Sequence, residues 1–415
     1  MTAPLRVLHV IPSISPLRGG PSKAVQEMVQ ALRGQGVDAS ILTTNDHGPG
    51  LDPSLPTGRW IDRHGVPLIA FPRWSPPVQA LREFAISPGL VQWLSSHIQR
   101  YDLLHVHAIF SFPSTWSMRE ARHAGIPYLV RTIGQLSPWS LSQSEGRKRW
   151  MLRLVEERNL QGAAALHYTT AAERDEARPL GLVPPALVLP LGVQLSVHQP
   201  RGAHQSNGAD RQLTRFLFLS RLHPKKQLER LLAALALVAQ QRPQAAWELR
   251  IAGRGEASYE QQLRELSSQL GIASRCHWLG HVEGRLKDQE LAAADWLVLP
   301  SAAENFGIAV VEGLAAGTPA ILSPQVAVAE MVQAAGAGLV CESAPPQLAS
   351  TLMLALGGPN GATREAARKL AAEHLAWPAI ASSLASSYIN ILDSSRGMRS
   401  PARLNKIRPP FKAIS

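Results

Sequence analysis

The sequence predicts an α/β protein made of two doubly wound, Rossmann-like domains that face each other across a cleft. Three observations support this prediction. Short apolar runs of buried-strand length alternate with segments of helical periodicity along most of the chain. This alternation begins twice, at residues 5–11 and again at residues 215–219. The chain of 415 residues is also too long for one ordinary domain and long enough for two separate cores.

The clearest unit of this pattern lies at residues 295–323. An apolar strand is predicted at 296–299, a helix at 307–316 with Gly317 in the position of a C-terminal cap, and a second strand at 320–322. Strand, helix and strand at this spacing form a right-handed crossover, and open α/β sheets bind ligands at the carboxyl ends of such strands. The loop after 296–299 is therefore expected to border the cleft.

The first domain, residues 1–195, is expected to begin with a strand at 5–11 and a helix at 21–32. Gly19 and Gly20 lie between them. Two glycines before a helix allow its backbone N–H groups to approach an anion, although a plain tight turn fits the same residues.

A further strand at 102–107 places His107 at the edge of the cleft. A single histidine at a strand end is more often structural than catalytic, so its position alone does not decide its role. The preceding segment 46–77 is rich in Pro, Gly and Trp and shows no clear periodicity.

The loop 132–141 follows a strand at 127–131 and contains Gly134 and Trp139. We assign these two residues to the acceptor side of the cleft, where a second substrate would bind. Segment 147–160 then combines basic and apolar residues at helical spacing. Such a helix fits an anionic bilayer surface, but it also fits an ordinary solvated helix because it contains acidic residues.

Residues 196–212 are polar, contain Gly and Asn, and have no apolar period, so they are the predicted linker. The second domain then covers 213–376. A last helix, 377–393, is expected to return to the first domain, and the basic segment 394–415 is expected to be a disordered tail.

Composition excludes several classes of protein. The two cysteines cannot form a disulfide framework, and no apolar run has the length of a membrane span. We therefore expect a cytoplasmic protein. The formal charge is +11, but six of the 42 basic residues lie in the tail, which has no acid. A nucleic-acid binder is disfavoured because the excess charge is concentrated there without an aromatic platform.

The loops at the predicted cleft carry a coherent chemical set. Arg221 and Lys226 follow a strand of the second domain, and the helix that begins near Gly307 adds backbone N–H groups. Together these groups suit a diphosphate. Glu312 suits the two hydroxyls of a ribose, and Glu304 suits the group beyond the phosphates. A nucleotide-sugar satisfies all of these residues.

These residues also resemble those of a known family. E-N-F-G-I-A-V-V-E, at 304–312, resembles the E-x7-E motif of retaining glycosyltransferases of group 1, family 4, which have the GT-B fold. L-S-R-L-H-P-K-K-Q, at 219–227, resembles the segment G-R-L-x-x-x-K-G of that family. R-G-G-P at 18–21 resembles its glycine loop, and H-V-H at 105–107 resembles the strand end whose second histidine faces the donor sugar. The resemblance covers the chain to about residue 392.

The resemblance implies transfer of a sugar from a nucleoside diphosphate sugar to an acceptor hydroxyl with retention, in the biosynthesis of a polysaccharide or a lipid-linked glycan. The implied catalytic residues are Glu304, His107, Arg221 and Lys226. The implied donor-binding residues are Gly19, Gly20, Arg221, Lys226, Asn305, Phe306, Gly307, Ile308 and Glu312.

The sequence contains no D-x-D motif, so no metal or other cofactor is expected and the cations of the protein must stabilise the leaving diphosphate. Retention requires either a covalent glycosyl-enzyme or attack from the face of the leaving group. We favour the second, because Glu304 is better placed to bind sugar hydroxyls than to attack the anomeric carbon.

Departures from the family pattern leave alternatives open. Ser220 and Gln227 stand where the family often has glycine, and L-G-V at 191–193 replaces N-G-V. A GT-B epimerase, a phosphorylase and a non-catalytic nucleotide-sugar-binding partner share the same fold. The basic segments also fit peripheral attachment to the inner face of the plasma membrane.

Overall fold

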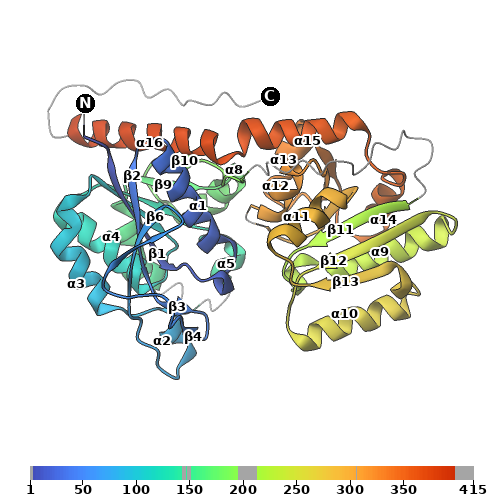
Figure 1. Cartoon of the computed structure of the whole chain (residues 1–415), viewed down its shortest axis with the longest axis horizontal. Helices are drawn as coiled ribbons and strands as arrows, with labels where there is room; N and C mark the ends of the chain where they lie inside the picture. Colours follow the sequence, from blue (N-terminus) through green and yellow to red (C-terminus); the bar gives the residue numbers. More distant parts are fainter. Residues whose placement is uncertain (1–2, 143–145, 147–150, 195–212, 305, 398–415) are drawn as a thin grey trace.

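The computed structural model describes residues 3–142, 146, 151–194, 213–304 and 306–397. Within these residues the chain forms two α/β domains, each built around its own sheet, with a long C-terminal helix that extends over the first (Figure 1). The predicted fold class, two Rossmann-like domains, is confirmed. The predicted linker and most of the predicted tail lie outside the described residues.

The N-terminal sheet has the strand order β10-β9-β8-β7-β1-β2-β6-β5 among the described residues. Neighbouring strands are parallel except β5 and β6. The strands are β1 (Arg6–Ser13), β2 (Asp38–Thr44), β5 (Trp60–Arg63), β6 (Val66–Phe71), β7 (Leu103–His107), β8 (Tyr128–Arg131), β9 (Ala165–Tyr168) and β10 (Ala186–Val188). A separate hairpin joins β3 (Asp46–His47) to β4 (Gly50–Leu51).

The helices of this domain connect the strands and cover both faces of the sheet. They are α1 (Gly20–Gly34), α2 (Gln79–Glu83), α3 (Pro88–His97), α4 (Phe112–Ala124), α5 (Pro138–Ser142), α7 (Glu157–Gln161) and α8 (Ala171–Ala177), with short 3-10 turns at Pro16–Arg18, Ile98–Arg100 and Arg178–Leu180 and a π-helical turn at Leu152–Glu156. α4 shows typical end signals: Ser111 caps its start, and Gly125, at φ 69°, ends it.

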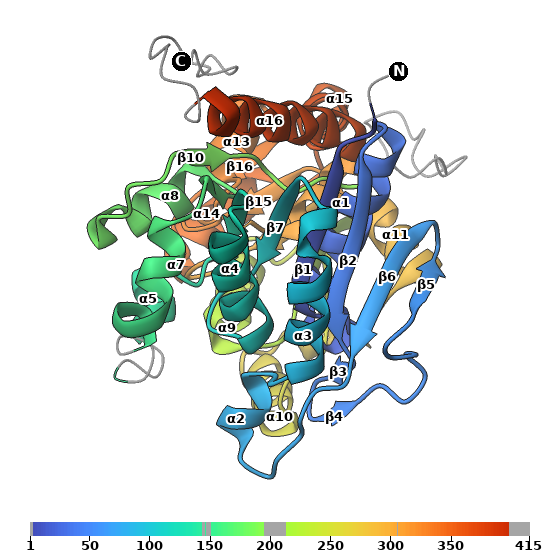
Figure 2. The ribbon, with the colours of Figure 1, turned by 90° about the vertical axis from the view of Figure 1, so that its left-hand side faces the viewer.

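Alternation along the strands gives the N-terminal sheet two different faces. Leu8, Val10 and Leu104 point to the face that α3 and α4 cover. Their sequence neighbours point to the opposite face, which α1 and α16 (Trp377–Gly397) cover. Figure 2 shows α3 and α4 in front of β1 and β7. This second face is important below because its central strands carry histidines.

The C-terminal sheet is entirely parallel within the described residues, in the order β13-β12-β11-β14-β15-β16. Its strands are β11 (Leu213–Leu219), β12 (Ala246–Ala252), β13 (Cys276–Gly280), β14 (Trp296–Leu299), β15 (Ala320–Leu322) and β16 (Gly338–Val340). Its helices are α9 (Leu228–Gln241), α10 (Ala257–Gln269), α11 (Gly284–Ala293), α12 (Ile308–Ala315), α13 (Ala329–Ala334), α14 (Pro345–Leu354) and α15 (Gly361–His374), with 3-10 turns at Pro224–Lys226 and Ala273–Arg275.

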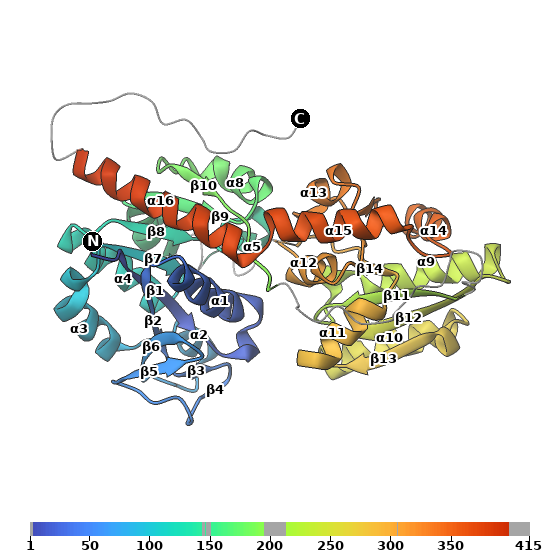
Figure 3. The same ribbon diagram turned by 45° about the horizontal axis from the view of Figure 1, so that its top comes forward.

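α16 begins at the boundary between the domains and runs back over the N-terminal sheet, as Figure 3 shows. Its first residue, Trp377, donates from Nε1 to Glu27 of α1 at 2.9 Å, and its backbone N–H donates to Val193. The indole ring lies so close to Gly192 that a Cβ there would be 2.3 Å away. The start of the helix is therefore held against the N-terminal domain.

Two expectations need correction. Segment 46–77, in which no periodicity was visible, contains β3 to β6. β6 is an interior strand with Pro67 as its second residue, and β5 is a half-exposed edge strand, so neither shows a clear apolar pattern. The described part of the basic segment 147–160 is not a uniformly solvated helix, since Glu156 is fully buried and contacts Thr115. None of the helices within the described residues combines the length and hydropathy needed to cross a bilayer.

Candidate functional site

Among the described residues, the ends of the two sheets come together through the following contacts between the domains. A Cβ on Gly20 would lie 2.6 Å from the side chain of Ile308, so the start of α1 abuts the start of α12. Lys23 Nζ of α1 lies 3.0 Å from Glu312 Oε1 of α12. On the other side, Lys225 Nζ lies 3.9 Å from the centre of the Trp139 ring. Gly20, Ile308 and Glu312 of the predicted donor-binding set are thus brought together.

Glu304 is held by its backbone in the loop after β14. Its N–H donates to Gln325 at 3.0 Å, and its carbonyl accepts from the N–H of Ala327 at 3.1 Å. Its side chain contacts the ammonium group of Lys226, which follows β11. Burial, with the nearby charges of Lys225 and Arg221, lowers the pKa of Lys226 to about 8, while the contact with Glu304 acts in the opposite direction.

Arg221 lies on the exposed loop after β11, and the backbone of that loop is packed tightly from behind. A Cβ on Gly253 would lie 1.8 Å from the carbonyl oxygen of Ser220, and one on Gly255 would lie 2.2 Å from that of Leu222. These two glycines therefore allow the Arg221 loop to rest directly on the backbone after β12. Among the described residues, no acid pairs with Arg221.

Gln227 occupies a position where the family often has glycine, and the structure explains that preference. Its backbone is left-handed, at φ 54° and ψ 39°. A side chain in this conformation costs about 1 kcal/mol. Its Oε1 is also buried without a hydrogen-bond partner within the described residues.

Glu312 is the half-buried carboxylate of α12, and two lysines approach the same oxygen. Lys287 of α11 lies 2.6 Å from Oε1 and Lys23 of the other domain 3.0 Å from it. α12 begins after Gly307, whose φ of 81° suits glycine. The ring of Phe306 is buried in the core, so it does not face the cleft. Asn305 lies outside the described residues.

His107 ends β7, at the strand end where the sequence places it. The side chain is fully buried, because the rings of His9 and His105 and the guanidinium of Arg131 surround it. Its Nε2 lies 3.0 Å from Nδ1 of His9. Burial lowers the pKa of His107 well below its ordinary value, so the ring is neutral.

The loops after β7 and β8 are strained. Ala108, Phe110 and Ile133 all have positive φ, between 53° and 69°, without being glycines. Such residues cost about 1–3 kcal/mol each and concentrate at functional sites. Both loops leave the sheet at the edge where His107 and the acceptor-side residues lie.

The two acceptor-side residues have different environments. The N–H of Gly134, which has φ 68°, donates to buried Glu173 at 2.6 Å and so fixes the loop. Trp139 is 46% exposed on α5, with Lys225 over one face of its ring. Trp139 is therefore both accessible and joined to the other domain by a cation–π contact.

Within the described residues, His9, His105 and His107 form the one group with nitrogens close enough to share a metal ion. Their hydrogen bonds argue against this use. Both nitrogens of His105 and both of His107 already face partners, and only His9 Nε2 is without one. The nearby Arg131 cation also disfavours a metal. We therefore interpret the group as a hydrogen-bonded network.

Sequence reasoning missed Lys23, Lys287, His9, Arg131 and Tyr388. Lys23 lies one helical turn after the glycine pair, which was a usable signal. His9, Arg131 and Tyr388 gave no local signal, because each lies within a strand or helix and meets its partners only in the folded chain.

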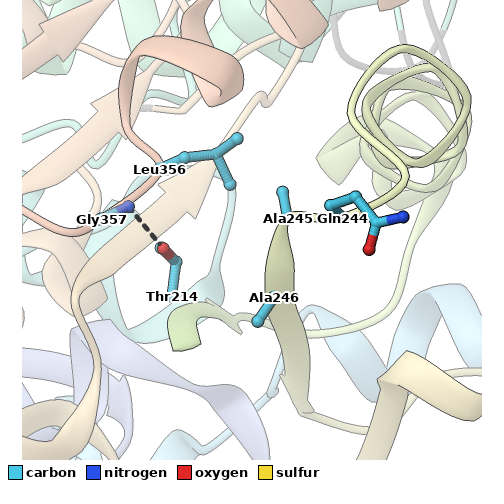
Figure 4. A pocket seen from close by; sticks show the side chains of 6 residues that line it. All are labelled: Thr214, Gln244, Ala245, Ala246, Leu356 and Gly357. Atoms are coloured by element: carbon cyan, nitrogen blue, oxygen red, sulfur yellow. Dashed lines mark hydrogen bonds between the residues drawn. The ribbon is translucent and has the colours of Figure 1, made fainter. Parts of the chain in front are cut away.

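Cavities lined by described residues open in the C-terminal domain. One of about 140 Å³ lies beside the Arg221 loop and is lined by Leu222, Arg254 and Trp278, among others. A larger one of about 370 Å³ lies between Thr214, Ala245 and Leu356, at the amino ends of β11 and β12 (Figure 4). The larger cavity is thus at the opposite edge of the sheet from the candidate site.

Comparisons with known proteins agree with this geometry. Residues 202–374 match the family model "Glycosyl transferases group 1", and residues 19–193 match "Glycosyl transferase 4-like domain". A D-inositol 3-phosphate glycosyltransferase of Thermomonospora curvata is 28% identical over 330 residues, covering 73% of this chain and 74% of that protein. A D-inositol 3-phosphate glycosyltransferase 2 of Catenulispora acidiphila is 25% identical and covers 92% of each.

Solved structures share the fold. Sucrose-phosphate synthase from Thermosynechococcus elongatus superimposes with a TM-score of 0.73 at 19% identity, over 94% of this chain and 100% of that one. HepE of Anabaena, in complex with UDP and glucose, gives 0.69 at 20% identity, over 93% and 100%. The architecture of the present chain is thus the GT-B fold.

Proposed function

The chain belongs to the group 1 glycosyltransferases, and on this premise we propose that it transfers a sugar from a nucleoside diphosphate sugar to a hydroxyl group, with retention of the anomeric configuration. The proposed acceptor is a polysaccharide or a lipid-linked glycan precursor. The proposal rests on one observation above all: Lys226 contacts Glu304 at the carboxyl edge of the C-terminal sheet, in the loop after β11 that also carries Arg221. HepE, a structural neighbour solved with UDP and glucose, supports a nucleotide-sugar donor.

Arg221 and Lys226 are assigned to the diphosphate. Lys226 contacts Glu304 in the free protein, so donor binding exchanges a carboxylate for phosphate oxygens around the ammonium group. These cations then stabilise the negative charge that grows on the leaving diphosphate, with help from the amino end of α12. The proposal requires no metal, since the cations of the protein supply the stabilisation.

Glu312 is assigned to the ribose and Glu304 to hydroxyls of the transferred sugar. Retention follows when the acceptor attacks from the face of the departing phosphate, which takes the acceptor proton. His107 is assigned to the transferred sugar on the N-terminal side. Because its ring is fully covered in the free protein, this contact requires a local rearrangement when the donor binds.

The first test is a donor screen. Thermal shift across UDP-, GDP- and ADP-sugars identifies the donor, because a ligand that binds only the folded state raises Tm by mass action. The donor is then incubated with lipid-linked glycans and with D-inositol 3-phosphate, the acceptor in the relatives' names. The anomeric configuration of the product is read by NMR.

Three variants examine the assignment. R221A and E304Q are expected to lower kcat at least a hundredfold with every acceptor. The matched control is R254A, a basic residue beside the same loop that has no assigned role. Unchanged turnover in R221A or E304Q refutes the proposed site. Donor consumption without an acceptor would identify an epimerase, and dependence on inorganic phosphate would identify a phosphorylase.

We also propose peripheral contact with an anionic membrane on the cytoplasmic side, based on the basic segments at 147–160 and 394–415. The full chain is expected to sediment with vesicles that contain anionic lipid. A chain that ends at residue 393 is expected to stay in the supernatant. Equal sedimentation of both chains refutes a role of the tail.

A further inference from the structure

A buried polar layer lies between the N-terminal sheet and α16. Its side chains come from four adjacent strands and from the helix, and each is 1% exposed or less. They are His9 of β1, His105 and His107 of β7, Arg131 of β8, His167 of β9 and Tyr388 of α16. Buried polar groups need partners, so the hydrogen bonds of this layer determine how its rings are placed.

One branch of the layer runs from β10 to α16. His167 Nε2 lies 2.9 Å from the carbonyl oxygen of Leu189, so this nitrogen carries a proton. Burial lowers the pKa of His167 to about 3, so its Nδ1 is an acceptor. His105 Nε2 lies 3.2 Å from that acceptor and donates to it. His105 Nδ1 is then an acceptor as well, and the hydroxyl of Tyr388 donates to it at 2.7 Å.

The other branch ends at His107. Arg131 Nη1 lies 3.5 Å from His107 Nδ1 and can only donate, so Nδ1 is the acceptor. The proton of neutral His107 is therefore on Nε2, which donates to His9 Nδ1 at 3.0 Å. One set of tautomers satisfies both branches: all four histidines carry their proton on Nε2.

The branches touch where the ring of His105 lies against that of His107. The centroids of His105 and His107 are 4.3 Å apart at an angle of 31°, and those of His9 and His107 are 5.2 Å apart at 14°. A rotation of the His105 ring would therefore displace His107. The hydrogen bond from Tyr388 opposes such a rotation, because it fixes one nitrogen of His105 while His167 fixes the other.

We propose that Tyr388 is a positioning residue for His107. It acts through His105 and makes α16 part of the catalytic machinery, although the helix lies behind the sheet. This inference rests on the proposed role of His107 in transfer. It also explains why a buried tyrosine of the last helix faces a strand of the first domain, 283 residues earlier in the chain.

The matched pair Y388F and Y128F tests the proposal. Both tyrosines are buried, and each hydroxyl donates one hydrogen bond, that of Tyr128 to the carbonyl oxygen of Asn159 at 2.5 Å. Y388F is expected to lower kcat about tenfold while the KM for the donor stays within twofold. Y128F removes a comparable hydrogen bond away from the layer and is expected to leave kcat within twofold. Equal kcat values in the two variants overturn the proposal.

A double-mutant cycle with H107A separates this inference from the proposed function. If Tyr388 acts through His107, then Y388F has no further effect on kcat in the H107A background. A tenfold effect in both backgrounds overturns the positioning role. Full activity of H107A refutes the assigned role of His107 itself, whatever Y388F does.

Spectra of ¹⁵N-histidine-labelled protein supply a readout that a merely structural role would not change. Four buried Nε2–H tautomers are expected in the unmodified chain, and Y388F is expected to shift the His105 and His107 signals while Y128F does not. If Y388F does not fold, H167L removes the acceptor that holds His105 from the other side and carries the same expectations. Unchanged histidine signals in the folded variant overturn the proposal.

Discussion

The two sheets have the same winding but bury different chemistry. The C-terminal sheet buries apolar side chains, such as Phe216, Phe218 and Ile251, and keeps its charged site residues in loops at the strand ends. The N-terminal sheet buries four histidines and Arg131 under α16. The C-terminal half is therefore an apolar platform with charges at its edge, whereas the N-terminal half depends on protonation and on hydrogen bonds within its interior.

The largest expected difference between the two halves is the effect of acid on their stability. The pKa of His9 and of His167 is about 3 in the folded chain and about 6.5 when exposed, because burial disfavours the cation. Below pH 6.5 the unfolded state binds protons that the folded state does not, so stability that is present above pH 6.5 is lost as pH falls toward 3. Going from pH 7 to pH 5 should cost about 2 kcal/mol for each of these two histidines.

Hydrogen exchange measures this loss of stability separately in each domain. Amides of β1, β7 and β9 are expected to lose protection at pH 5, while those of β11 and β14 retain it after correction for intrinsic rates. Equal loss in both sheets would contradict the comparison.

The packing of the C-terminal domain can be disturbed by one added methyl group. G253A places a Cβ 1.8 Å from the Ser220 carbonyl, which must move together with the Arg221 loop. We expect a loss of about 3 kcal/mol in the urea unfolding of the C-terminal domain and a higher KM for the donor. G271A is the matched control, because Gly271 also has positive φ, 71°, but open space around its Cβ position. A loss in G253A no larger than in G271A would count against the packing argument.

The ammonium group of Lys226, at the edge of the C-terminal sheet, should titrate on the alkaline side of neutral pH. Lys226, with a pKa lowered to about 8 by burial, is charged below that pH and neutral above it. kcat/KM for the donor should therefore fall about tenfold per pH unit above pH 8. K226R keeps its charge and is expected to lose this alkaline limb. An identical limb in K226R would assign the titration to another group.

The smallest effect concerns Gln227. Q227G removes the cost of a left-handed side chain and a buried oxygen without a partner, but it also adds freedom to the unfolded chain. A net gain of about 0.5 kcal/mol in unfolding free energy is expected, while Q227A, which removes the same oxygen but keeps the left-handed side chain, should give a smaller gain. A loss of stability in Q227G would show that the side chain contributes more than its backbone costs.

The fold was predictable because its signals are local. Apolar runs gave most of the strands, and the position of Glu304 and Lys226 after two parallel strands was enough to place them at one sheet edge. The burial of His107 was not predictable, since a strand end defines an edge but not the rings that cover it. β6 was hidden by Pro67, and the contact of Tyr388 with His105 joins residues with no shared pattern.

The return of α16 also bears on how the chain is made. During synthesis the strands of the N-terminal domain leave the ribosome long before Trp377 does. The face of the sheet that carries the histidines therefore stays uncovered until the whole C-terminal domain and α16 have been made. Closing a loop of 283 residues adds only a modest entropic penalty, but it cannot happen early. We therefore expect the nascent first domain to remain a client of chaperones until the last helix docks.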